Sequence, residues 1–342
     1  MQDYVIRPVK ESDLPRVLEI ARQTGPGFNS LPNNAGVIEK KIHLSIDSFT
    51  EKVEIKKRFY LFVMENLKSR EVVGTAGIKA CVGMPCPFYK FKLINLVLFS
   101  PSLNQSNKYR FLHLANDHEN ATELDALYLK STYRGEGRGV FMSRSRLLFI
   151  AEFTDFFSDR IVADMRGVSN EKGVSPFWEV VGKNFFGMSY EKASYLKATE
   201  GSQFVIDLIP HYPIYVDLLP EEAQKSIGVT HQNTVPAYST LIKERLQFKE
   251  YVDIFDGGPL IEGLKSEIWS VKESQKLLLV SCKAKLQQKE LRLISNTQKD
   301  FRAILGKIEL TEDGGAIMEE DAARALNVTA NDYVRFSTFK HG

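Results

Sequence analysis

The residues best suited to chemistry are concentrated in Arg134–Gly139, which reads RGEGRG. This run follows an alternating segment that is typical of a strand, and it precedes the helical spacing of Phe141, Leu148 and Phe149. A strand, a glycine-rich turn and a helix leave unpaired backbone N–H groups at the positive end of the helix dipole. Glycine also lets an anion approach the backbone closely. The pattern therefore predicts a loop that binds a diphosphate.

The spacing of the glycines separates this loop from commoner phosphate loops. A P-loop ends in Gly-Lys-Ser/Thr, whereas Val140 and Phe141 follow Gly139. A dinucleotide fingerprint reads Gly-x-Gly-x-x-Gly, whereas the order here is Gly-x-Gly-x-Gly. The order Arg134-x-x-Gly137-x-Gly139 resembles the pyrophosphate loop of the GCN5-related N-acyltransferases, which implies an acyl-coenzyme A ligand. Taken alone, the loop is also compatible with a glycine-rich surface turn.

Composition excludes several classes of protein. The 342 residues allow two domains, and 43% hydrophobic with 26% charged residues is ordinary for a globular chain. A net charge of +2 without a long basic run argues against nucleic-acid or membrane partners. No apolar run approaches the roughly 20 residues that span a bilayer, and Cys81, Cys86 and Cys282 suit neither a disulfide framework nor a metal site. We therefore expect a cytoplasmic protein that holds no metal.

The predicted elements give the loop a scaffold. In the central strand we expect Leu124, Ala126 and Tyr128 on one face and Asp125, Leu127 and Leu129 on the other. Before it, an insertion at 85–120 carries one apolar strand, Leu93–Phe99. The other expected elements are a strand at Tyr4–Pro8, helices from Leu14 to Ala21 and from Ile38 to Val53, strands at Phe59–Glu65, Val72–Val82 and Arg160–Met165, and a helix from Ser175 that stops at Gly182.

The second part of the chain is less regular. Thr234–Phe248 reads as a fainter copy of the helix that begins at Ser175, which suggests two related halves. The last part has β-rich runs and a short helix, at Ile268–Val271, Leu277–Lys283, Glu290–Ile294, Phe301–Leu305, Ala322–Leu326 and Tyr333–Thr338. We predict an α+β fold: a GCN5-related N-acyltransferase-like mixed sheet flanked by helices, with a small C-terminal β-barrel-like module. The expected domains are 1–190, which carries the loop, 191–262, a partial second half that carries His231, and 263–342, the β-rich module.

Several stretches together resemble the arginine N-succinyltransferases, which degrade arginine through succinylated intermediates. They include VIRPVKESDL, SLPNNA, LANDHENATELDALYL, YRGEGRG, VADMRGVSNEKGVSPFWEVVGKNFF, HYPIYVDLLPEEAQKSIGVTHQNTVPA and YVDIFDGGP, and they cover roughly residues 4–262. The resemblance implies succinyl-coenzyme A as co-substrate and the α-amino group of L-arginine as acceptor. The products are then N2-succinyl-L-arginine and free coenzyme A.

The resemblance also implies site residues. The proton-donating histidine of the family matches His231 in VTHQNTVPA, and the succinyl-coenzyme A contact on the central strand matches Leu127. The diphosphate contacts fall on Arg134, Gly135, Gly137, Arg138 and Gly139. By charge alone, Asp117, His118 and Glu123 are candidates near the arginine substrate, and Arg166 is the candidate for the distal succinyl carboxylate.

One residue departs from expectation. Asp125 stands where a small or thiol-bearing residue is expected, so an Asp125 side chain that faces the cleft opens the choice of acceptor. The reaction needs no covalent acyl-enzyme, because holding both substrates together supplies much of the rate. The alternatives are a related N-acyltransferase with another acyl donor or amine, such as ornithine, and a non-catalytic acyl-coenzyme A-binding regulatory protein. We expect a homo-oligomer.

Overall fold

The structure is a computed structural model that describes residues 3–24, 28, 30–84, 86–170, 173–201 and 203–339. Within them, sixteen strands form one mixed sheet in the order β14-β15-β11-β16-β12-β13-β1-β2-β3-β6-β7-β10-β9-β4-β5-β8. The strands are β1 (Tyr4–Pro8), β2 (Phe59–Asn66), β3 (Val72–Lys79), β4 (Lys90–Ser100), β5 (Gln105–Ala115), β6 (Thr122–Leu129), β7 (Arg160–Asp164), β8 (Ile214–Tyr215), β9 (Gln247–Asp253), β10 (Pro259–Leu264), β11 (Gln275–Lys283), β12 (Arg292–Asn296), β13 (Ala303–Gly306), β14 (Ile308–Leu310), β15 (Ala316–Glu319) and β16 (Tyr333–Thr338).

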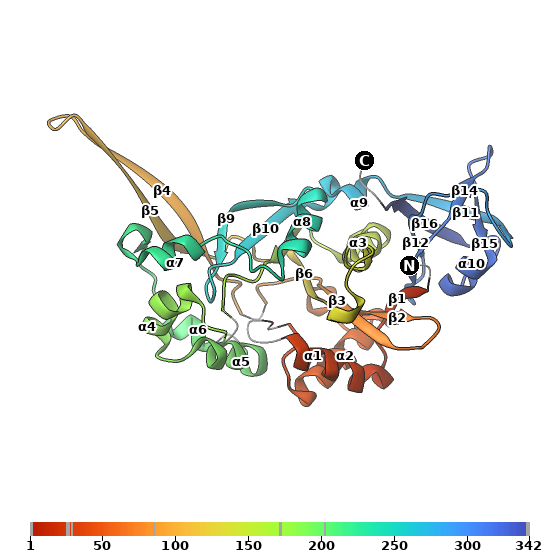
Figure 1. The fold of residues 1–342 in the computed structure, drawn as a ribbon, viewed down its shortest axis with the longest axis horizontal. Coiled ribbons are helices and arrows are strands. Elements are labelled where there is room, and N and C mark those ends of the chain that lie inside the picture. The colour runs from red at the N-terminus through yellow and green to blue at the C-terminus, as the bar shows by residue number, and fades with distance from the viewer. Residues whose placement is uncertain are drawn as a thin grey trace.

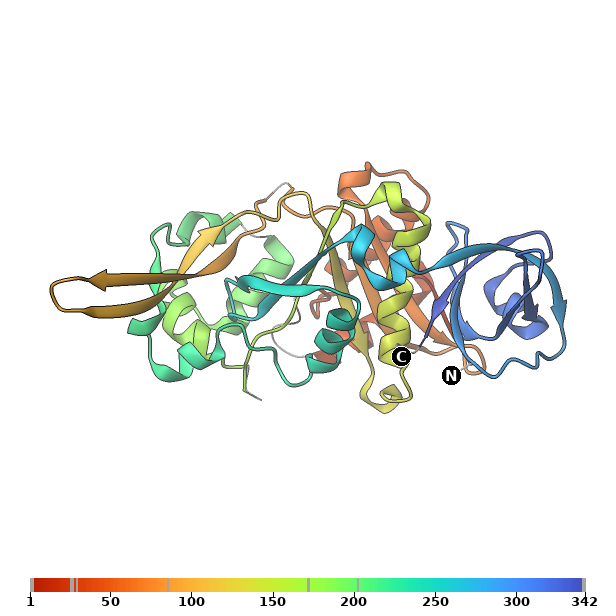
Figure 2. The same cartoon turned by 90° about the horizontal axis from the view of Figure 1, so that it is seen from above.

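Helices cover both faces of the middle of this sheet (Figures 1 and 2). They are α1 (Leu14–Thr24), α2 (Ala35–Phe49), α3 (Arg138–Glu152), α4 (Lys183–Phe186), α5 (Tyr190–Glu200), α6 (Gln203–Leu208), α7 (Glu221–Ser226), α8 (Val235–Lys243), α9 (Trp269–Lys272) and α10 (Glu320–Leu326). Helices α1 and α2 bury Val17, Ile20, Ile38 and Ile42 against one face of the central strands. Helix α3 lies on the opposite face, where Phe141, Leu148 and Phe149 join the largest core. The expected mixed sheet flanked by helices is confirmed.

The central strand β6 contains a bulge. Ala126 has a φ of 52°, and the register with β3 shifts between Thr75 and Gly77. A positive φ is strained for a residue with a Cβ atom, and a bulge moves the following side chains to the other face. Leu124, Leu127 and Leu129 therefore share the core under α3, whereas Ala126 and Tyr128 face α1 and α2. The predicted alternation was wrong, because an unbroken period of two assumes that every residue pairs.

Arg146 stabilises this bulge from the face of the sheet that α3 covers. The side chain is 2% exposed, and its Nη1 donates to the carbonyls of Asp125 at 3.2 Å and Gly77 at 3.4 Å. Its Nη2 donates to Ser143 Oγ at 3.0 Å. Burial lowers the pKa of Arg146 to about 10, so the guanidinium remains charged at neutral pH. A fully buried cation thus donates to two carbonyl groups beside the bulge.

A second irregularity lies at the start of the same strand. Strand β7 pairs in parallel with β6 only at Thr122↔Ile161 and Glu123↔Val162. On its other edge, β7 pairs with β10 over its whole length, from Arg160 to Asp164. The two central strands therefore separate immediately before the bulge, and among the described residues no other strand pairs with this edge of β6.

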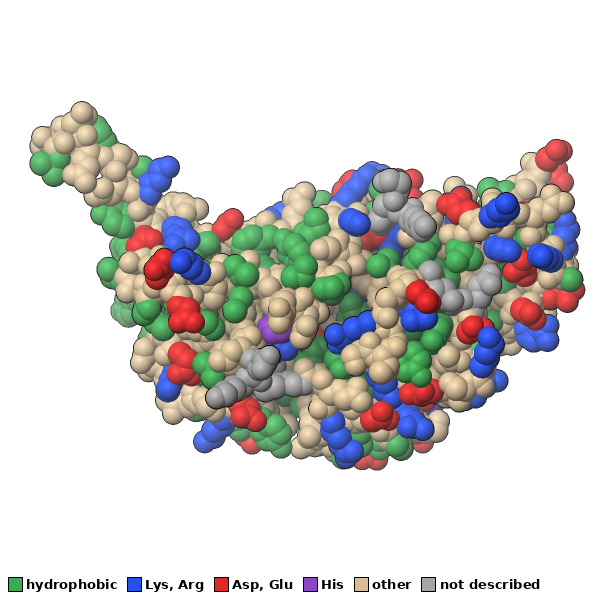
Figure 3. Space-filling model, viewed as in Figure 1, with side chains coloured by type: hydrophobic (Ala, Val, Ile, Leu, Met, Phe, Trp, Pro, Cys, Tyr) green, Lys and Arg blue, Asp and Glu red, His purple; other side chains and the backbone are tan. Residues whose placement is uncertain are grey.

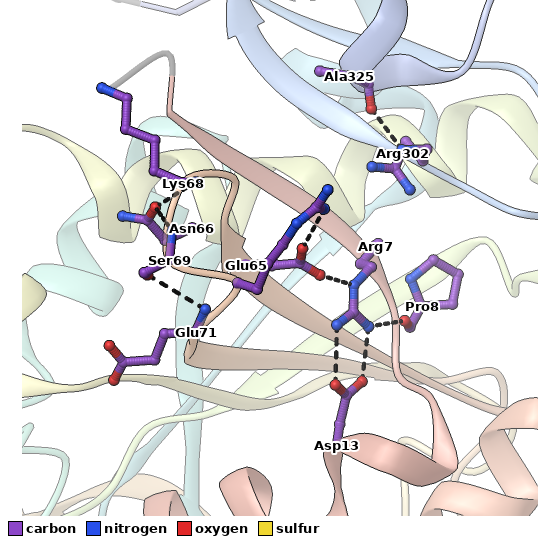
Figure 4. Close-up of polar contacts among 11 residues, drawn as sticks. Arg7, Pro8, Asp13, Glu65, Asn66, Lys68, Ser69, Glu71, Arg302 and Ala325 are labelled. Carbon is purple, nitrogen blue, oxygen red and sulfur yellow. Dashed lines mark hydrogen bonds and ion pairs between the residues drawn. The ribbon is translucent and has the colours of Figure 1, made fainter.

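The two ends of the chain meet in the sheet. Strand β1 pairs with β13 through Ile6↔Ala303. Beside this junction, Arg7 is buried and donates to the carboxylates of Glu65 on β2 and Asp13 before α1 (Figure 4). The first strand is thereby fixed to the N-terminal helix and to the C-terminal strands by the same short segment.

Several predicted elements need correction. The insertion at 85–120 holds two long strands, β4 and β5, and not one, because the polar residues of β5 hide its alternation. The helix that begins after Ser175 does not stop at Gly182 but passes through a π-helical turn, Trp178–Gly182, into α4. Ile268–Val271 is not a strand, since α9 occupies Trp269–Lys272. Short strands β14 and β15 were not expected.

The core also contains an ion pair with no exposed surface. Arg144 Nε of α3 lies 2.6 Å from Glu244 Oε1 after α8, and both side chains are 0% exposed. Ser270 of α9 donates its backbone N–H and its hydroxyl to the same carboxylate. Arg144 Nη1 donates to the Phe339 carbonyl at 2.7 Å. Four separate segments therefore depend on one buried charge pair.

We predict that Glu244→Gln lowers the free energy of unfolding by about 3–5 kcal/mol, because it leaves the Arg144 cation buried without its counter-charge. The change is isosteric, so packing is preserved. Urea unfolding followed by circular dichroism measures the effect.

The control is Glu179→Gln, which removes an exposed carboxylate from Lys183 at 2.7 Å. That variant should lose at most about 1 kcal/mol. Equal losses in the two variants would contradict the role given to the buried pair.

Candidate functional site

A cleft of about 870 Å³ opens where β6 and β7 separate. Its lining comes from the segment between α1 and α2, from β6, from the loop before α3, from the end of β7, and from α5 and α8. Predicted site residues that line it are Glu123, Leu127, Arg134, Gly135, Gly137, Gly139 and Arg166. The structure thus brings together a glycine-rich loop, a bare strand edge and charged side chains from distant parts of the chain.

The glycine-rich loop has the geometry of an anion site. Gly135, Glu136 and Gly137 have φ angles of 101°, 50° and 77°, and Gly137 is the N-cap of α3. The backbone N–H groups of these three residues have no hydrogen-bond partner within the described part of the chain. Consecutive free N–H groups at a helix N-terminus attract anions. Arg134 adds a cation beside the same loop, and its Nε donates to the Leu129 carbonyl at 3.2 Å.

Gly139 is informative because the protein itself does not require it. It is the second residue of α3, and a Cβ atom there would meet nothing within 4 Å. Glycine in a helix costs about 1 kcal/mol relative to alanine. A bound molecule that approaches this position closely would explain the glycine, since such an approach needs the absence of Cβ.

The bare edge of β6 presents backbone groups to the cleft. Lys130 donates its N–H to the Val73 carbonyl of β3 at 3.0 Å. N–H groups of successive residues in a strand point to opposite edges, so those of Leu127 and Leu129 point away from β3. That edge is the one from which β7 has diverged. The Leu127 N–H can therefore donate to a carbonyl oxygen in the cleft.

The wall beside α2 carries charges of both signs. Lys79 Nζ lies 2.6 Å from Glu123 Oε2 and 3.3 Å from Asp125 Oδ2. Although burial acts in the other direction, Lys79 and Lys41 lower the pKa of Asp125, while Asp125 and Glu123 raise that of Lys79. Burial lowers the pKa of Lys41 to about 8, and its Nζ donates to the Ser30 carbonyl at 2.6 Å. Asp125 thus lines the cleft as part of a mixed-charge cluster.

The opposite wall carries Arg166 and Asp256. Arg166 Nη2 donates to Ser169 Oγ at 2.9 Å, while its buried Nε finds no partner among the described residues. Asp256 accepts backbone N–H groups of Gly167 and Gly258 and the hydroxyl of Tyr190. Burial, helped by the charge of Asp253, raises the pKa of Asp256 to about 6. Asp256 fixes the backbone after β7, and Arg166 retains a donor for a further acceptor.

His231 lies just behind this wall and is 8% exposed. The ring Nδ1 of His231 accepts the backbone N–H of Asn233 at 3.1 Å. The backbone N–H of His231 donates to the Arg166 carbonyl at 2.8 Å. Burial and the charge of Arg166 lower the pKa of the imidazole, although a hydrogen bond with the Ser169 backbone opposes them. The ring is therefore neutral at pH 7. The next residues, Gln232–Thr234, line the cleft.

Besides His231, three predicted site residues do not line the cleft. His118 is 1% exposed and hydrogen-bonds through Nε2 to Glu262 of β10. Asp117 accepts the Tyr251 hydroxyl at 2.5 Å. Arg138 donates to the Tyr133 carbonyl and pairs with Glu136. Each is engaged within the protein, although His118 Nδ1 and Arg138 Nε find no hydrogen-bond partner among the described residues.

Sequence reasoning missed Lys41, Lys79 and Arg146. Lys79 ends the apolar strand β3, and Lys41 lies between the buried Ile38 and Ile42 of α2. Both could therefore have been recognised as unusual cations. Arg146 had no such signal, because only the bulge explains it.

The described residues contain no group of three or more His, Cys, Asp or Glu side chains placed to hold a metal ion. Nor does any helix formed by them have the length and apolar character needed to cross a membrane.

Comparison with known proteins places this geometry in context. Residues 4–270 match the family model described as arginine N-succinyltransferase beta subunit, and residues 278–338 match that of its C-terminal domain. An arginine N-succinyltransferase of Yersinia enterocolitica is 39% identical over 332 residues, which are 96% of each chain. One from Escherichia coli is 35% identical over 332 residues, 97% of this chain and 96% of that protein. The solved structure of arginine/ornithine succinyltransferase subunit AI from Pseudomonas aeruginosa matches with a TM-score of 0.90 at 34% identity and covers 100% of both chains.

Proposed function

Because the chain belongs to the arginine N-succinyltransferase family, we propose that it transfers the succinyl group of succinyl-coenzyme A to the α-amino group of L-arginine. The observation that carries this proposal is one cleft in which a glycine-rich helix N-terminus, a bare strand edge and a mixed-charge cluster meet. An acyl-coenzyme A needs the first two features, and an amino acid with a charged side chain fits the third.

The donor would enter at the loop before α3. The free N–H groups of Gly135 and Gly137, with Arg134, would hold the diphosphate, and the pantetheine arm would lie along the open edge of β6. The thioester carbonyl would then accept from the Leu127 N–H, which stabilises negative charge as the nitrogen attacks. Arg166, with its unpartnered buried Nε, would hold the distal carboxylate that distinguishes succinyl from acetyl.

The acceptor would occupy the wall beside α2. Carboxylates of Glu123 and Asp125 can receive the guanidinium of arginine, and Lys41 can receive its α-carboxylate. Asp117 and His118 take no part in this proposal, because both lie in a separate polar cluster with Tyr251 and Glu262.

Proton transfer is assigned to His231. A neutral imidazole can accept the proton of the attacking amine and then return it to the departing sulfur, directly or through one water. Direct attack within a ternary complex breaks the thioester C–S bond as the amide C–N bond forms. The two walls of the cleft support this order, because each offers polar groups to a different substrate.

A second acceptor is supported by one observation. Asp125 stands where a small or thiol-bearing residue is expected, and its carboxylate faces the cleft. An additional negative charge there favours an acceptor with a compact cation, such as the side-chain ammonium of ornithine. A non-catalytic acyl-coenzyme A-binding protein is the third reading, with the same loop but no turnover.

A thiol-release assay separates these readings. Succinyl-coenzyme A, acetyl-coenzyme A and no donor are crossed with arginine, ornithine and buffer. Release that requires succinyl-coenzyme A and arginine supports the leading proposal. Release with ornithine alone supports the second reading, and donor binding without release supports the third.

We expect Gly139→Ala to raise the KM for succinyl-coenzyme A about tenfold or more, because the new methyl group projects into the space of the donor. The same change should raise helix stability by up to about 1 kcal/mol. Steady-state kinetics and thermal unfolding measure the two effects.

Gly36→Ala provides a matched control, since Gly36 is also the second residue of its helix, α2, and does not line the cleft. It should change stability similarly and leave KM unchanged. An unaltered KM in Gly139→Ala would place the diphosphate elsewhere.

Arg166→Met should lower kcat/KM for succinyl-coenzyme A about 10–100-fold, which corresponds to one lost charged hydrogen bond. Turnover with acetyl-coenzyme A should change little, because acetyl has no distal carboxylate. Lys41→Met is the comparison: it should raise the KM for arginine and preserve the ratio between the two donors. A parallel loss with both donors in Arg166→Met would contradict the assignment.

His231→Asn should lower kcat by about 10²–10⁴-fold while the affinity for coenzyme A is retained. The native enzyme needs the neutral ring, whose pKa lies below its ordinary value of 6.5. Activity should therefore fall as pH decreases through that lowered pKa, and this acidic limb should disappear in the variant. A pH profile of kcat/KM measures both, and an acidic limb that persists in His231→Asn would assign the titration to another group.

A further inference from the structure

The hairpin of β4 and β5 projects from the body as an arm (Figures 1 and 2). The two strands pair without interruption from Lys90↔Ala115 to Ser100↔Gln105. Strand β9 pairs with β4 only as far as Lys92, and β8 pairs with β5 only at Phe111 and Leu112. Residues 93–110 therefore form a two-stranded ribbon that no third strand of the described chain accompanies.

The outer part of this arm is apolar and uncovered on both faces. Side chains of successive strand residues point to opposite faces, yet consecutive residues are all exposed: Leu96 by 37%, Val97 by 57%, Leu98 by 52% and Phe99 by 61%. Leu103 in the turn is 72% exposed. Hydrophobic side chains are visible along the projecting arm in Figure 3. An isolated two-stranded ribbon is at best marginally stable in water, so this arm needs a partner.

Apolar and polar residues are divided between the two strands. Along the ribbon, Phe99 is paired with Ser106, Leu98 with Asn107, and Val97 with Lys108. Each face is consequently apolar along β4 and polar along β5. A tip that inserts into a lipid surface would need apolar side chains on both strands, whereas this division directs the partner to the β4 edge.

The β4 edge also lacks the features that normally prevent strand pairing. Residues 93–100 read LINLVLFS, without a charge or a proline, and their β-ladder with β5 has no bulge. Natural edge strands are commonly protected by lysine, proline or bulges. The β5 edge differs, since it carries Lys108 and Arg110, and the Arg110 N–H donates to Asp217 at 2.8 Å.

We propose that the arm is a dimerisation element in which β4 pairs antiparallel with β4 of a second copy of this chain about a two-fold axis. The resulting order, β5-β4-β4-β5, places the uncharged apolar strands in the middle and the polar strands outside. An identical strand pairs with itself there without opposing like charges, whereas pairing through β5 would bring Lys108 and Arg110 close to their copies. The inference is independent of the proposed reaction.

Sedimentation velocity on the full chain at up to roughly 100 µM tests the association, because even a micromolar dimer is populated there. We expect a dimer for the native chain and a monomer for the double variant Val97→Lys, Phe99→Lys. The matched control is Val280→Lys, Leu310→Lys, which changes two residues of the C-terminal module that are 49% and 59% exposed. That control should remain dimeric, and thermal unfolding verifies that both variants are folded.

A cross-link tests the pairing through the β4 edge without a change of charge. Val97→Cys should form an intermolecular disulfide on oxidation, whereas Asn107→Cys on β5 and the native chain should not. A monomeric native chain, or a cross-link at Asn107 without one at Val97, would overturn the proposal. So would a monomer that co-sediments with phosphatidylcholine–phosphatidylglycerol vesicles through Val97 and Phe99.

Discussion

The separation of β6 from β7 after two paired residues is the constraint on which the cleft depends. A strand edge without a partner leaves N–H and C=O groups unpaired, which is costly inside a protein unless another group receives them. Arg146 occupies the carbonyls of Asp125 and Gly77 from below, while the Leu127 N–H remains open toward the cleft. The same irregularity that weakens the sheet therefore supplies the donor that a thioester oxygen requires.

Charge balance gives the cleft its two different walls. Beside α2, Lys79 pairs with Glu123 and Asp125. Although burial acts in the other direction, Lys79 lowers the pKa of Asp125, whereas burial and the charge of Asp125 raise the pKa of Glu123. Across the cleft, Arg166 has an unused donor, and burial, helped by the charge of Asp253, raises the pKa of the nearby Asp256 carboxyl to about 6. One wall thus suits a molecule with both signs of charge, and the other suits a single carboxylate. This division agrees with an amino-acid acceptor and a dicarboxylic acyl donor.

Sequence patterns predicted the structure correctly where the residues concerned are consecutive in the chain. The glycine spacing of Arg134–Gly139 predicted a helix N-terminus with free N–H groups, because strand, turn and helix are consecutive there. The bulge at Ala126 could not be predicted from its own strand, since it arises from the register with β3, and the faces of β6 were consequently assigned wrongly. Asp117 and His118 were selected by charge, but Tyr251 and Glu262, more than 130 residues away, engage them. The domain boundaries at 190 and 262 stay predictions.

Helix α3 links these features because it serves three sites along its length. Its first turn forms the loop that would hold the diphosphate, and Arg146 two turns later supports the bulge. Between them, Arg144 joins Glu244 and the Phe339 carbonyl, which ties the helix to α8 and to the end of the chain. A rigid helix transmits a shift at any one of these points to the others. None of the described residues of the C-terminal module lines the cleft, but Phe339 holds the helix whose N-terminus and Arg146 border it.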